Sequence, residues 1–386
     1  MRHHPVAPVD VEIAGASFAG LVCARVCAER GLRTVVWERK PHPGAALHTT
    51  GLLVREVADE LGLPLELTRK LRTVRLYAPS LRSLDLASPG YFFLATETSG
   101  LLEELARRAE DAGAELRFGR SFDGRRTAAV LVGADGPRSR VARLAGLGVN
   151  HRFLAGVEVE LEGAGDLQER LHVFLDGHLA PGYLGWAFPG VGVTQVGIAC
   201  RRPVRPDLDA FRRRIADVLD LSPARVVGTR GGLIPVGGVV RPFASRDVVL
   251  VGDAAGLVSP LTGGGIHLAL RSGRAAGLAI AAHLLDGGPD PGTALRVIAP
   301  RFLGKRALRA AFDLGPPNAV VDRAFGSMGF RALAQTVFFH HRGLLSSAAW
   351  RDLATGTRSP GERGTSVGGN PPRAWARSGA GARRGP

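Results

Sequence analysis

The residues with the clearest chemical potential stand in a short turn near the start of the chain. Gly15, Ser17 and Gly20 have the spacing GxSxxG, after an apolar segment at 9–13 and before a helical pattern at 19–29. The N–H groups and the positive dipole end of such a helix suit a pyrophosphate. Gly15 allows the tight turn and Gly20 allows close packing of helix on strand, while Ser17 stands where a further glycine is usual.

An acidic residue follows this turn at the distance expected for a ribose contact. Residues 34–37 form a second apolar strand pattern, and Glu38 ends it eighteen residues after Gly20. Its carboxylate can accept hydrogen bonds from a ribose diol, whereas a solvated charge at a strand end is the alternative. The strand, turn, helix and strand together predict a dinucleotide site, to which we also assign Phe18, Ala19 and Arg39.

Two further apolar strand patterns end in acidic turns. Residues 130–133 run into Ala134-Asp135-Gly136, and residues 248–251 run into Gly252-Asp253 and a glycine cluster. One such turn is common and means little by itself. Three strand–turn units in one chain are more specific, because the carboxyl ends of parallel strands meet at one edge of a sheet.

These segments resemble the motifs of a two-domain flavoprotein superfamily that includes aromatic hydroxylases and geranylgeranyl reductases. LVGADGPRSR at 131–140 resembles its DG motif, and VGDAAGLVSPLTGGG at 251–265 resembles its GD motif. The resemblance spans roughly residues 9–285 and implies FAD as cofactor, with Asp253 on the ribityl hydroxyls. The backbone N–H groups of 262–265 would face the flavin N1/O2 side, where reduced flavin carries negative charge. The flavin-binding residues implied here are Thr50, Gly51, Asp135, Gly136, Gly252, Asp253, Pro260, Thr262, Gly263, Gly264, Gly265 and Ile266.

One segment is similar to the geranylgeranyl reductases in particular. PGYLGWAFP at 181–189 resembles their PxxYxWxFP box, which implies that Tyr183, Leu184, Trp186 and Phe188 bind a prenyl substrate. Leu184 occupies the tyrosine position of the box, and Tyr183 lies one residue earlier. Because side chains alternate along a strand, we expect Leu184, Trp186 and Phe188 on one face and Tyr183 on the other. The pocket wall would then be wholly apolar, unless a bulge restores the tyrosine. Ordinary core packing of the two aromatic residues is the alternative.

A second departure from the superfamily lies before the helix expected at 101–112. The superfamily usually places an arginine near the start of this helix, close to the cofactor. This chain instead has the sequence TETSG at 96–100.

The resemblance implies an FAD-dependent oxidoreductase that reduces C=C bonds of an isoprenoid or other apolar substrate by hydride transfer from reduced flavin. Solvent or a protein acid would supply the proton, and the sequence identifies no catalytic acid. No second dinucleotide motif stands out, so NADPH or a ferredoxin is expected as electron donor. The alternatives are a monooxygenase of an aromatic or polyketide substrate, a lycopene-cyclase-like flavoprotein, and a flavin- or lipid-binding protein without turnover.

The elements that position these residues predict an α/β fold. We expect a Rossmann-type FAD-binding domain built from residues 1–72, 95–150 and 232–299. A discontinuous β-sheet substrate domain is expected from residues 73–94 and 151–231. Residues 300–354 are expected to form a C-terminal helical region, and residues 355–386 a disordered basic tail.

Composition restricts the function classes further. The chain has 386 residues, 45% of them hydrophobic and 22% charged, which excludes a mostly disordered protein. Its net charge of +15 favours an anionic partner, but no nucleic-acid-binding signature accompanies it. We therefore expect no nucleic acid and consider peripheral membrane contact instead. The apolar segment at 275–285 is too short to span a bilayer.

The cysteines and histidines predict neither a disulfide framework nor a metal site. Three cysteines, Cys23, Cys27 and Cys200, fit a reducing, cytoplasmic compartment. Cys23 and Cys27 are expected as small buried residues of one helix face, with a redox pair as the alternative. His340 and His341 are adjacent, so they point to different sides of a helix. The oligomeric state does not follow from the sequence.

Overall fold

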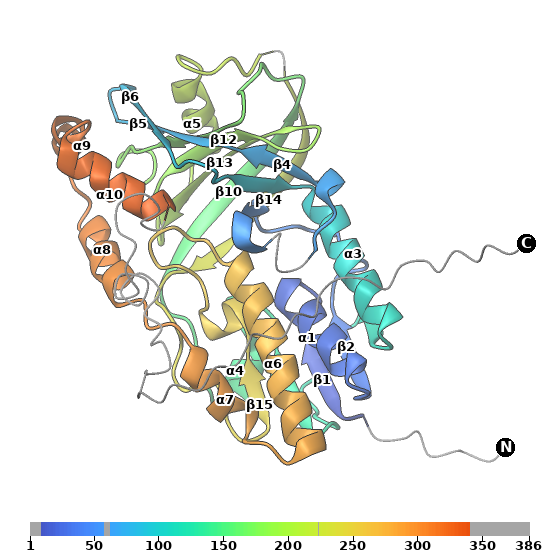
Figure 1. The fold of residues 1–386 in the computed structure, drawn as a ribbon. Coiled ribbons are helices and arrows are strands. Elements are labelled where there is room, and N and C mark those ends of the chain that lie inside the picture. Colours follow the sequence, from blue (N-terminus) through green and yellow to red (C-terminus); the bar gives the residue numbers. More distant parts are fainter. Residues whose placement is uncertain (1–8, 58–61, 223, 340–386) are drawn as a thin grey trace, which may run out of the picture.

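The lower lobe in Figure 1 is built on a five-stranded parallel sheet, here called sheet A. The computed structural model describes residues 9–57, 62–222 and 224–339, and the strands of sheet A run in the order β15-β9-β1-β2-β8. They are β1 (Val11–Ala14), β2 (Thr34–Glu38), β8 (Glu115–Phe118), β9 (Val130–Gly133) and β15 (Val248–Leu250). β1, β2, β9 and β15 are short apolar runs and are largely buried, as expected of parallel strands covered on both faces.

Two helices of this lobe touch almost backbone to backbone. α1 (Phe18–Glu29) follows β1, and α6 (Ile266–Asp286) packs along it. A Cβ atom at Gly273 would lie 2.2 Å from the carbonyl oxygen of Ala19, and one at Gly277 would lie 2.7 Å from Cβ of Val26. The absence of these side chains brings the helices together, and Figure 1 shows their N-terminal ends at the side that faces the upper lobe.

The upper lobe contains a seven-stranded sheet, here called sheet C. Its strands run in the order β14-β10-β13-β12-β11-β5-β6, with β5 and β11 the parallel pair in an otherwise antiparallel sheet. They are β5 (Thr73–Tyr77), β6 (Ser83–Ala87), β10 (Phe153–Glu162), β11 (Arg170–Phe174), β12 (Gly185–Pro189), β13 (Thr194–Arg201) and β14 (Arg225–Pro235). Helix α5 (Leu208–Ile215) covers one face through Phe211 and Ile215. The opposite face is therefore available to the lower lobe.

A small antiparallel sheet forms where the residue pattern alone favours a helix. Residues 52–62 have a helical pattern in the sequence, but 52–54 form strand β3 (Leu52–Val54) and only 55–57 of the described part are helical. β3 pairs with β7 (Phe93–Thr96), which also pairs with β4 (Thr68–Leu71). Pairing with a strand forty residues away has overridden the local pattern.

The segment that resembles the reductase box is also shaped differently from the prediction. β12 begins at Gly185, so Tyr183 and Leu184 lie in the preceding turn, where the N–H of Tyr183 donates to the Ala180 carbonyl at 2.9 Å. Strand alternation therefore does not apply to them, and the prediction that Tyr183 points away from Leu184, Trp186 and Phe188 is wrong. All four side chains belong to one apolar cluster.

Helices complete the described chain on one side of the molecule. They are α7 (Pro291–Ile298), α8 (Leu303–Asp313), α9 (Asn318–Ala324) and α10 (Met328–Phe339). The last three lie within the helical region expected at 300–354. His340, His341, the rest of the segment to 354 and the tail at 355–386 lie outside the described residues. Within the described ranges, no helix combines the length and apolar character needed to cross a membrane.

Candidate flavin-binding and active site

One large cavity lies where the carboxyl edge of sheet A meets the free face of sheet C. Its volume is about 1040 Å³, and its walls come from the turns after β1, β2, β9 and β15, from the N-terminus of α6 and from β10, β12 and β14. Ligands bind at this edge of open parallel sheets. The sequence-predicted residues that line it are Gly15, Ser17, Phe18, Ala19, Glu38, Arg39, Thr50, Asp135, Gly136, Trp186, Gly252, Asp253, Gly263, Gly265 and Ile266.

The turn between β1 and α1 presents unused backbone donors to this cavity. Ser17 is the N-cap of α1, but its side chain caps no N–H group, and the first turn of α1 has no acidic residue. Gly15 has φ of +107°, and a Cβ there would lie 2.3 Å from the carbonyl oxygen of Ala134. Only glycine fits this position, and the resulting close turn leaves the helix N-terminus open to an anion.

The Glu38 carboxylate orients the same turn. Oε2 accepts a hydrogen bond from the Ala16 N–H at 2.8 Å, and Oε1 accepts one from the Lys40 N–H at 2.9 Å. Each carboxylate oxygen has a further lone pair, so Glu38 can still accept from a ribose hydroxyl at the cavity wall.

The two acidic motifs are joined by a residue that the sequence analysis missed. Asn150 donates through Nδ2 to the carbonyl oxygens of Pro137 at 3.1 Å and Asp253 at 2.8 Å. Asp135 uses Oδ2 to accept the N–H groups of Arg140 and Val141 at the start of α4 (Arg140–Leu144). Its Oδ1 is buried and has no partner in the described chain, which suits a ligand hydroxyl.

The third motif places an acid beside a second helix N-terminus. Asp253 lies in the 3₁₀ turn η2 (Gly252–Ala255), and burial raises the pKa of its carboxyl to about 6. α6 starts at Ile266 after Gly265, without a capping side chain and without an acid in its first turn. Backbone donors, the orphaned Oδ1 of Asp135 and the Asp253 carboxyl match the phosphates and hydroxyls of FAD, so these residues fit that cofactor.

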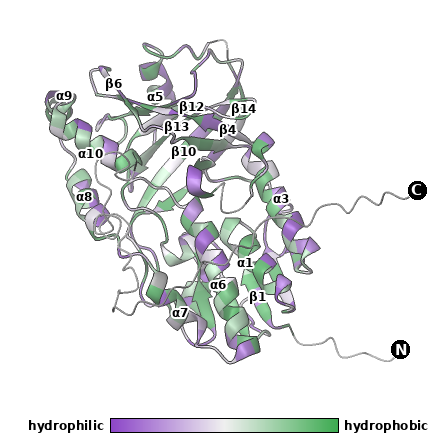
Figure 2. Cartoon of the chain, viewed as in Figure 1, coloured by the Kyte–Doolittle hydropathy of each residue, from purple (hydrophilic) through white to green (hydrophobic). Residues whose placement is uncertain are grey.

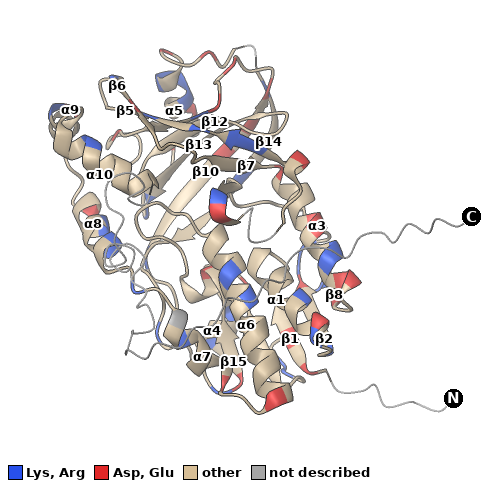
Figure 3. Cartoon of the chain, viewed as in Figure 1, with Lys and Arg blue, Asp and Glu red and all other residues tan. Residues whose placement is uncertain are grey.

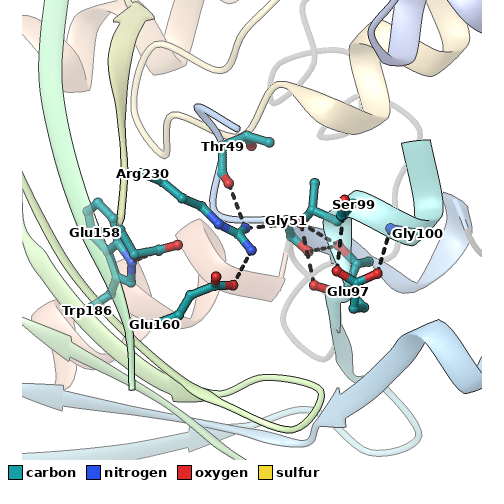
Figure 4. Close-up of polar contacts among 11 residues, drawn as sticks. Thr49, Gly51, Glu97, Ser99, Gly100, Glu158, Glu160, Trp186 and Arg230 are labelled. Carbon is teal, nitrogen blue, oxygen red and sulfur yellow. Dashed lines mark hydrogen bonds and ion pairs between the residues drawn. The ribbon is translucent and has the colours of Figure 1, made fainter. Parts of the chain in front are cut away.

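An arginine from sheet C approaches the site from the opposite side. Arg230 of β14 pairs with Glu160 of β10 and donates to the Thr49 carbonyl at 3.0 Å and to Thr98 Oγ1 at 3.2 Å (Figure 4). Thr98 is the first residue of helix α3 (Thr98–Asp111). A guanidinium thus reaches the start of this helix from β14, although the segment 96–100 contains no arginine.

The same strand region holds a buried acid. Trp186 Nε1 donates to Oε2 of Glu158 at 2.6 Å, and both residues line the cavity. Burial raises the pKa of Glu158 to about 7. The cavity wall near Trp186 therefore carries Glu158 and Arg230, so the expectation of a wholly apolar wall is wrong.

Several predicted site residues do not line the cavity. Tyr183 lies behind the loop at 262–265, here called the glycine loop, and its hydroxyl donates to the Thr262 carbonyl at 2.5 Å. Leu184 and Phe188 pack in the apolar cluster of the upper lobe instead. A Cβ at Gly20 would lie 1.9 Å from the carbonyl oxygen of Gly15, so Gly20 shapes the turn. The full set outside the cavity wall is Gly20, Gly51, Pro260, Thr262, Gly264, Tyr183, Leu184 and Phe188.

Comparison with known proteins shows which family the chain is similar to. A family described as an NAD(P)-binding Rossmann-like domain matches residues 13–62. The chain is 30% identical over 337 residues to digeranylgeranylglycerophospholipid reductase 2 of Methanothermobacter thermautotrophicus, covering 79% of this chain and 84% of that protein. It is 29% identical over 318 residues to the chloroplastic geranylgeranyl diphosphate reductase of Oryza sativa subsp. japonica, covering 72% and 67%.

A solved structure has the same fold. The geranylgeranyl bacteriochlorophyll reductase-like protein of Thermoplasma acidophilum superposes with a TM-score of 0.74 at 21% identity, over 87% of this chain and 99% of that one. The sequence relatives determine the family of the chain, and the solved structure supports the arrangement of its two lobes.

Proposed function

The chain belongs to the geranylgeranyl reductase family of flavin-dependent oxidoreductases, and from this premise we propose that it reduces C=C bonds in the isoprenoid chain of a lipid. The observation that carries the proposal is that the dinucleotide edge of sheet A and the Trp186 face of sheet C line the same cavity. One site can then hold a flavin and an apolar substrate together.

FAD is the cofactor that we assign to the sheet A side of the cavity. The N-terminus of α1 would hold the pyrophosphate, Glu38 a ribose and Asp253 the ribityl chain. The N-terminus of α6 would stabilise negative charge on the flavin ring. When bound and reduced, the flavin supplies the hydride equivalent for the reaction.

The sheet C side would exclude water and orient the substrate. Trp186 and Ile234 line the cavity, and behind them lies the apolar cluster that contains Leu154 and Phe188. An isoprenoid chain offers no hydrogen-bonding group along its length, so apolar walls are what it requires. Arg230 would keep the loop at 48–51 in place against this wall through the Thr49 carbonyl.

The electron donor is the finer part of the proposal. We assign it to NADPH or a ferredoxin that docks transiently, because the described residues contain one GxSxxG turn and its helix, which the FAD pyrophosphate would occupy. Reduction of the bound flavin by each donor in turn, followed as bleaching of the flavin absorbance, separates the two.

Peripheral membrane contact is supported by the surface of the last helices. Exposed apolar side chains occur along them, with exposed fractions of 74% for Val297 in α7, 87% for Leu314 at the end of α8 and 89% for Met328 in α10. Exposed arginines lie on the same helices, and Figures 2 and 3 show the apolar and the basic positions along these ribbons. Apolar insertion combined with positive charge suits an anionic bilayer surface. Co-sedimentation with phosphatidylglycerol vesicles, but less with phosphatidylcholine vesicles, is expected; equal recovery with both would contradict the charge contribution.

The decisive experiment follows reoxidation of dithionite-reduced protein without oxygen. Addition of a geranylgeranylated glycerophospholipid should restore the oxidised flavin spectrum, and the product should gain two hydrogen atoms for each bond reduced. Oxygen-dependent reoxidation with a hydroxylated product would instead indicate a monooxygenase, and a product of unchanged mass a cyclase. Asp253→Asn should lose FAD, whereas the matched control Asp247→Asn, at an exposed pair with Arg126, should keep it. A protein that takes up no flavin would refute the proposal.

A further inference from the structure

The cavity contains a buried acid that the assigned roles leave unused. Glu158 is 3% exposed, lies on β10 and lines the cavity. Its Oε2 accepts the hydrogen bond from Trp186, but its Oε1 is buried and has no partner in the described chain (Figure 4). Buried carboxyl oxygens in folded proteins nearly always have a partner, so the orphaned Oε1 requires an explanation.

No counter-ion is bonded to this carboxyl among the described residues. Arg230 stands directly opposite Glu158 on β14, yet its guanidinium is bonded to Glu160, Thr49 and Thr98. On the other side β13 faces Glu158 with Gly197. The charges that act on Glu158 are thus Arg230, which favours the ionised form, and Glu160, which opposes it, and burial outweighs both.

Glu158 is the acid on the substrate side of the cavity. The other carboxyl groups of the cavity wall, on Glu38, Asp135 and Asp253, belong to the strand ends and turns of sheet A. Alternate residues of a strand share a face, and Glu158 shares the face of sheet C that carries Trp186. Resting on the reductase function proposed above, we propose that Glu158 is the catalytic acid that gives a proton to a substrate carbon.

The reaction balances with this assignment. The C=C π bond breaks, and two C–H bonds form on the two carbons. One hydrogen arrives with an electron pair from the reduced flavin, which is oxidised, and the other arrives as the Oε1 proton of Glu158. Glu158 is left as a carboxylate, held by the Trp186 N–H, and regains a proton from water. A carboxyl whose pKa is raised to about 7 is still about half protonated at neutral pH, so a proton is available for this step.

The test compares Glu158→Gln with Glu162→Gln. The second variant makes the same substitution four residues further along β10. Glu162 is exposed and pairs with Arg225 at the surface. Glu158→Gln should still bind FAD and be reduced by dithionite, while reoxidation by the isoprenoid lipid slows by about 100-fold, the usual contribution of a general acid. Glu162→Gln should reoxidise at the wild-type rate, and Glu158→Asp should recover part of the lost rate.

A second measurement does not depend on turnover. The infrared difference spectrum between wild type and Glu158→Gln isolates the carboxyl band of Glu158 in the full-length protein as purified. A protonated band that disappears as pH rises through about 7 is expected, together with a wild-type reoxidation rate that falls over the same range. A Glu158 that is ionised throughout pH 5 to 8 would overturn the proposal, and Glu158→Asp, which shifts the carboxyl band, serves as the reference if the glutamine variant does not fold.

The failures of the two proposals are distinguishable. If the wild type is reoxidised by the lipid and Glu158→Gln reacts within about threefold of that rate, Glu158 is not the acid but the reductase function stands. If no isoprenoid reoxidises the wild type, both proposals fall together.

Discussion

Replacing Arg230 by methionine tests whether sheet C holds the cavity loop in place. Methionine keeps much of the aliphatic volume and removes the guanidinium. The change leaves the Glu160 carboxylate without its partner, and it removes the donor to the Thr49 carbonyl and to Thr98. The Arg230 side chain is 6% exposed, so water cannot readily replace these contacts.

The expected loss of stability is about 3 kcal/mol. Removing one partner of a buried ion pair costs about 3–5 kcal/mol, and the 21% exposure of the Glu160 side chain places this case at the lower end. For a chain of this length that corresponds to a fall in Tm of about 4 °C. FAD affinity should also fall, because Thr49 and Thr50 line the cavity.

The assay is thermal unfolding by circular dichroism, with FAD affinity measured by fluorescence titration. Arg225→Met is the matched control, since Arg225 pairs with Glu162 across the same two strands but is 75% exposed. It should change stability by no more than about 0.5 kcal/mol. Equal melting temperatures for Arg230→Met and Arg225→Met would refute the assignment of Arg230 as a tether.

Three further changes probe the other contacts of the site. Gly15→Ala should abolish FAD binding, because its Cβ would meet the Ala134 carbonyl, whereas Gly31→Ala, at φ of +84° in open space, should cost only about 1 kcal/mol in a melt. The FAD-free protein should lose stability as pH rises from 3.8 to about 6, because Asp253 releases its proton over this range in the unfolded chain but retains it in the folded protein. Asp253→Asn should flatten this part of the curve of Tm against pH. Tyr183→Phe should cost about 1 kcal/mol through the lost Thr262 hydrogen bond, and flavin titration should show weaker binding.

Each of these expectations has a clear contrary result. Tight FAD binding by Gly15→Ala would mean that the turn relaxes. If the Tm of the wild type rises between pH 4 and 6 and the Tm of Asp253→Asn follows the same curve, other carboxyls control stability in acid. Unaltered flavin affinity in Tyr183→Phe would mean that the glycine loop holds its shape without the tether.

The parts of the site that the sequence predicts are those encoded by contiguous residues. The turn at Gly15, the acid at Glu38 and the strand ends before Asp135 and Asp253 each combine an apolar run with a turn, so a short window contains the whole signal. Family resemblance then assigns the chain to the flavin-dependent reductases. The division into domains and the individual cofactor contacts stay predictions.

The residues that the sequence analysis missed act across strands. Arg230 has no local motif, and only the pairing of β14 with β10 brings it to Glu160 and to the loop at Thr49. In the sequence, Glu158 looks like any acidic residue of an alternating strand. Only the fold brings Trp186 within hydrogen-bonding distance of it. Asn150 is likewise an ordinary loop residue in sequence. Such contacts depend on register between distant segments, which no window of residues contains.

The packing of α1 against α6 has a consequence for how the protein is made. α1 leaves the ribosome early, but the helix that covers it follows about 250 residues later, after the whole of sheet C. At a translation rate of about 5–20 residues per second, the apolar side of α1 stays uncovered for at least about ten seconds before α6 is synthesised. β15, which completes sheet A, is equally late. The nascent lower lobe should therefore be a client of chaperones, and slower translation between residues 130 and 250 should lower the yield of folded protein rather than raise it.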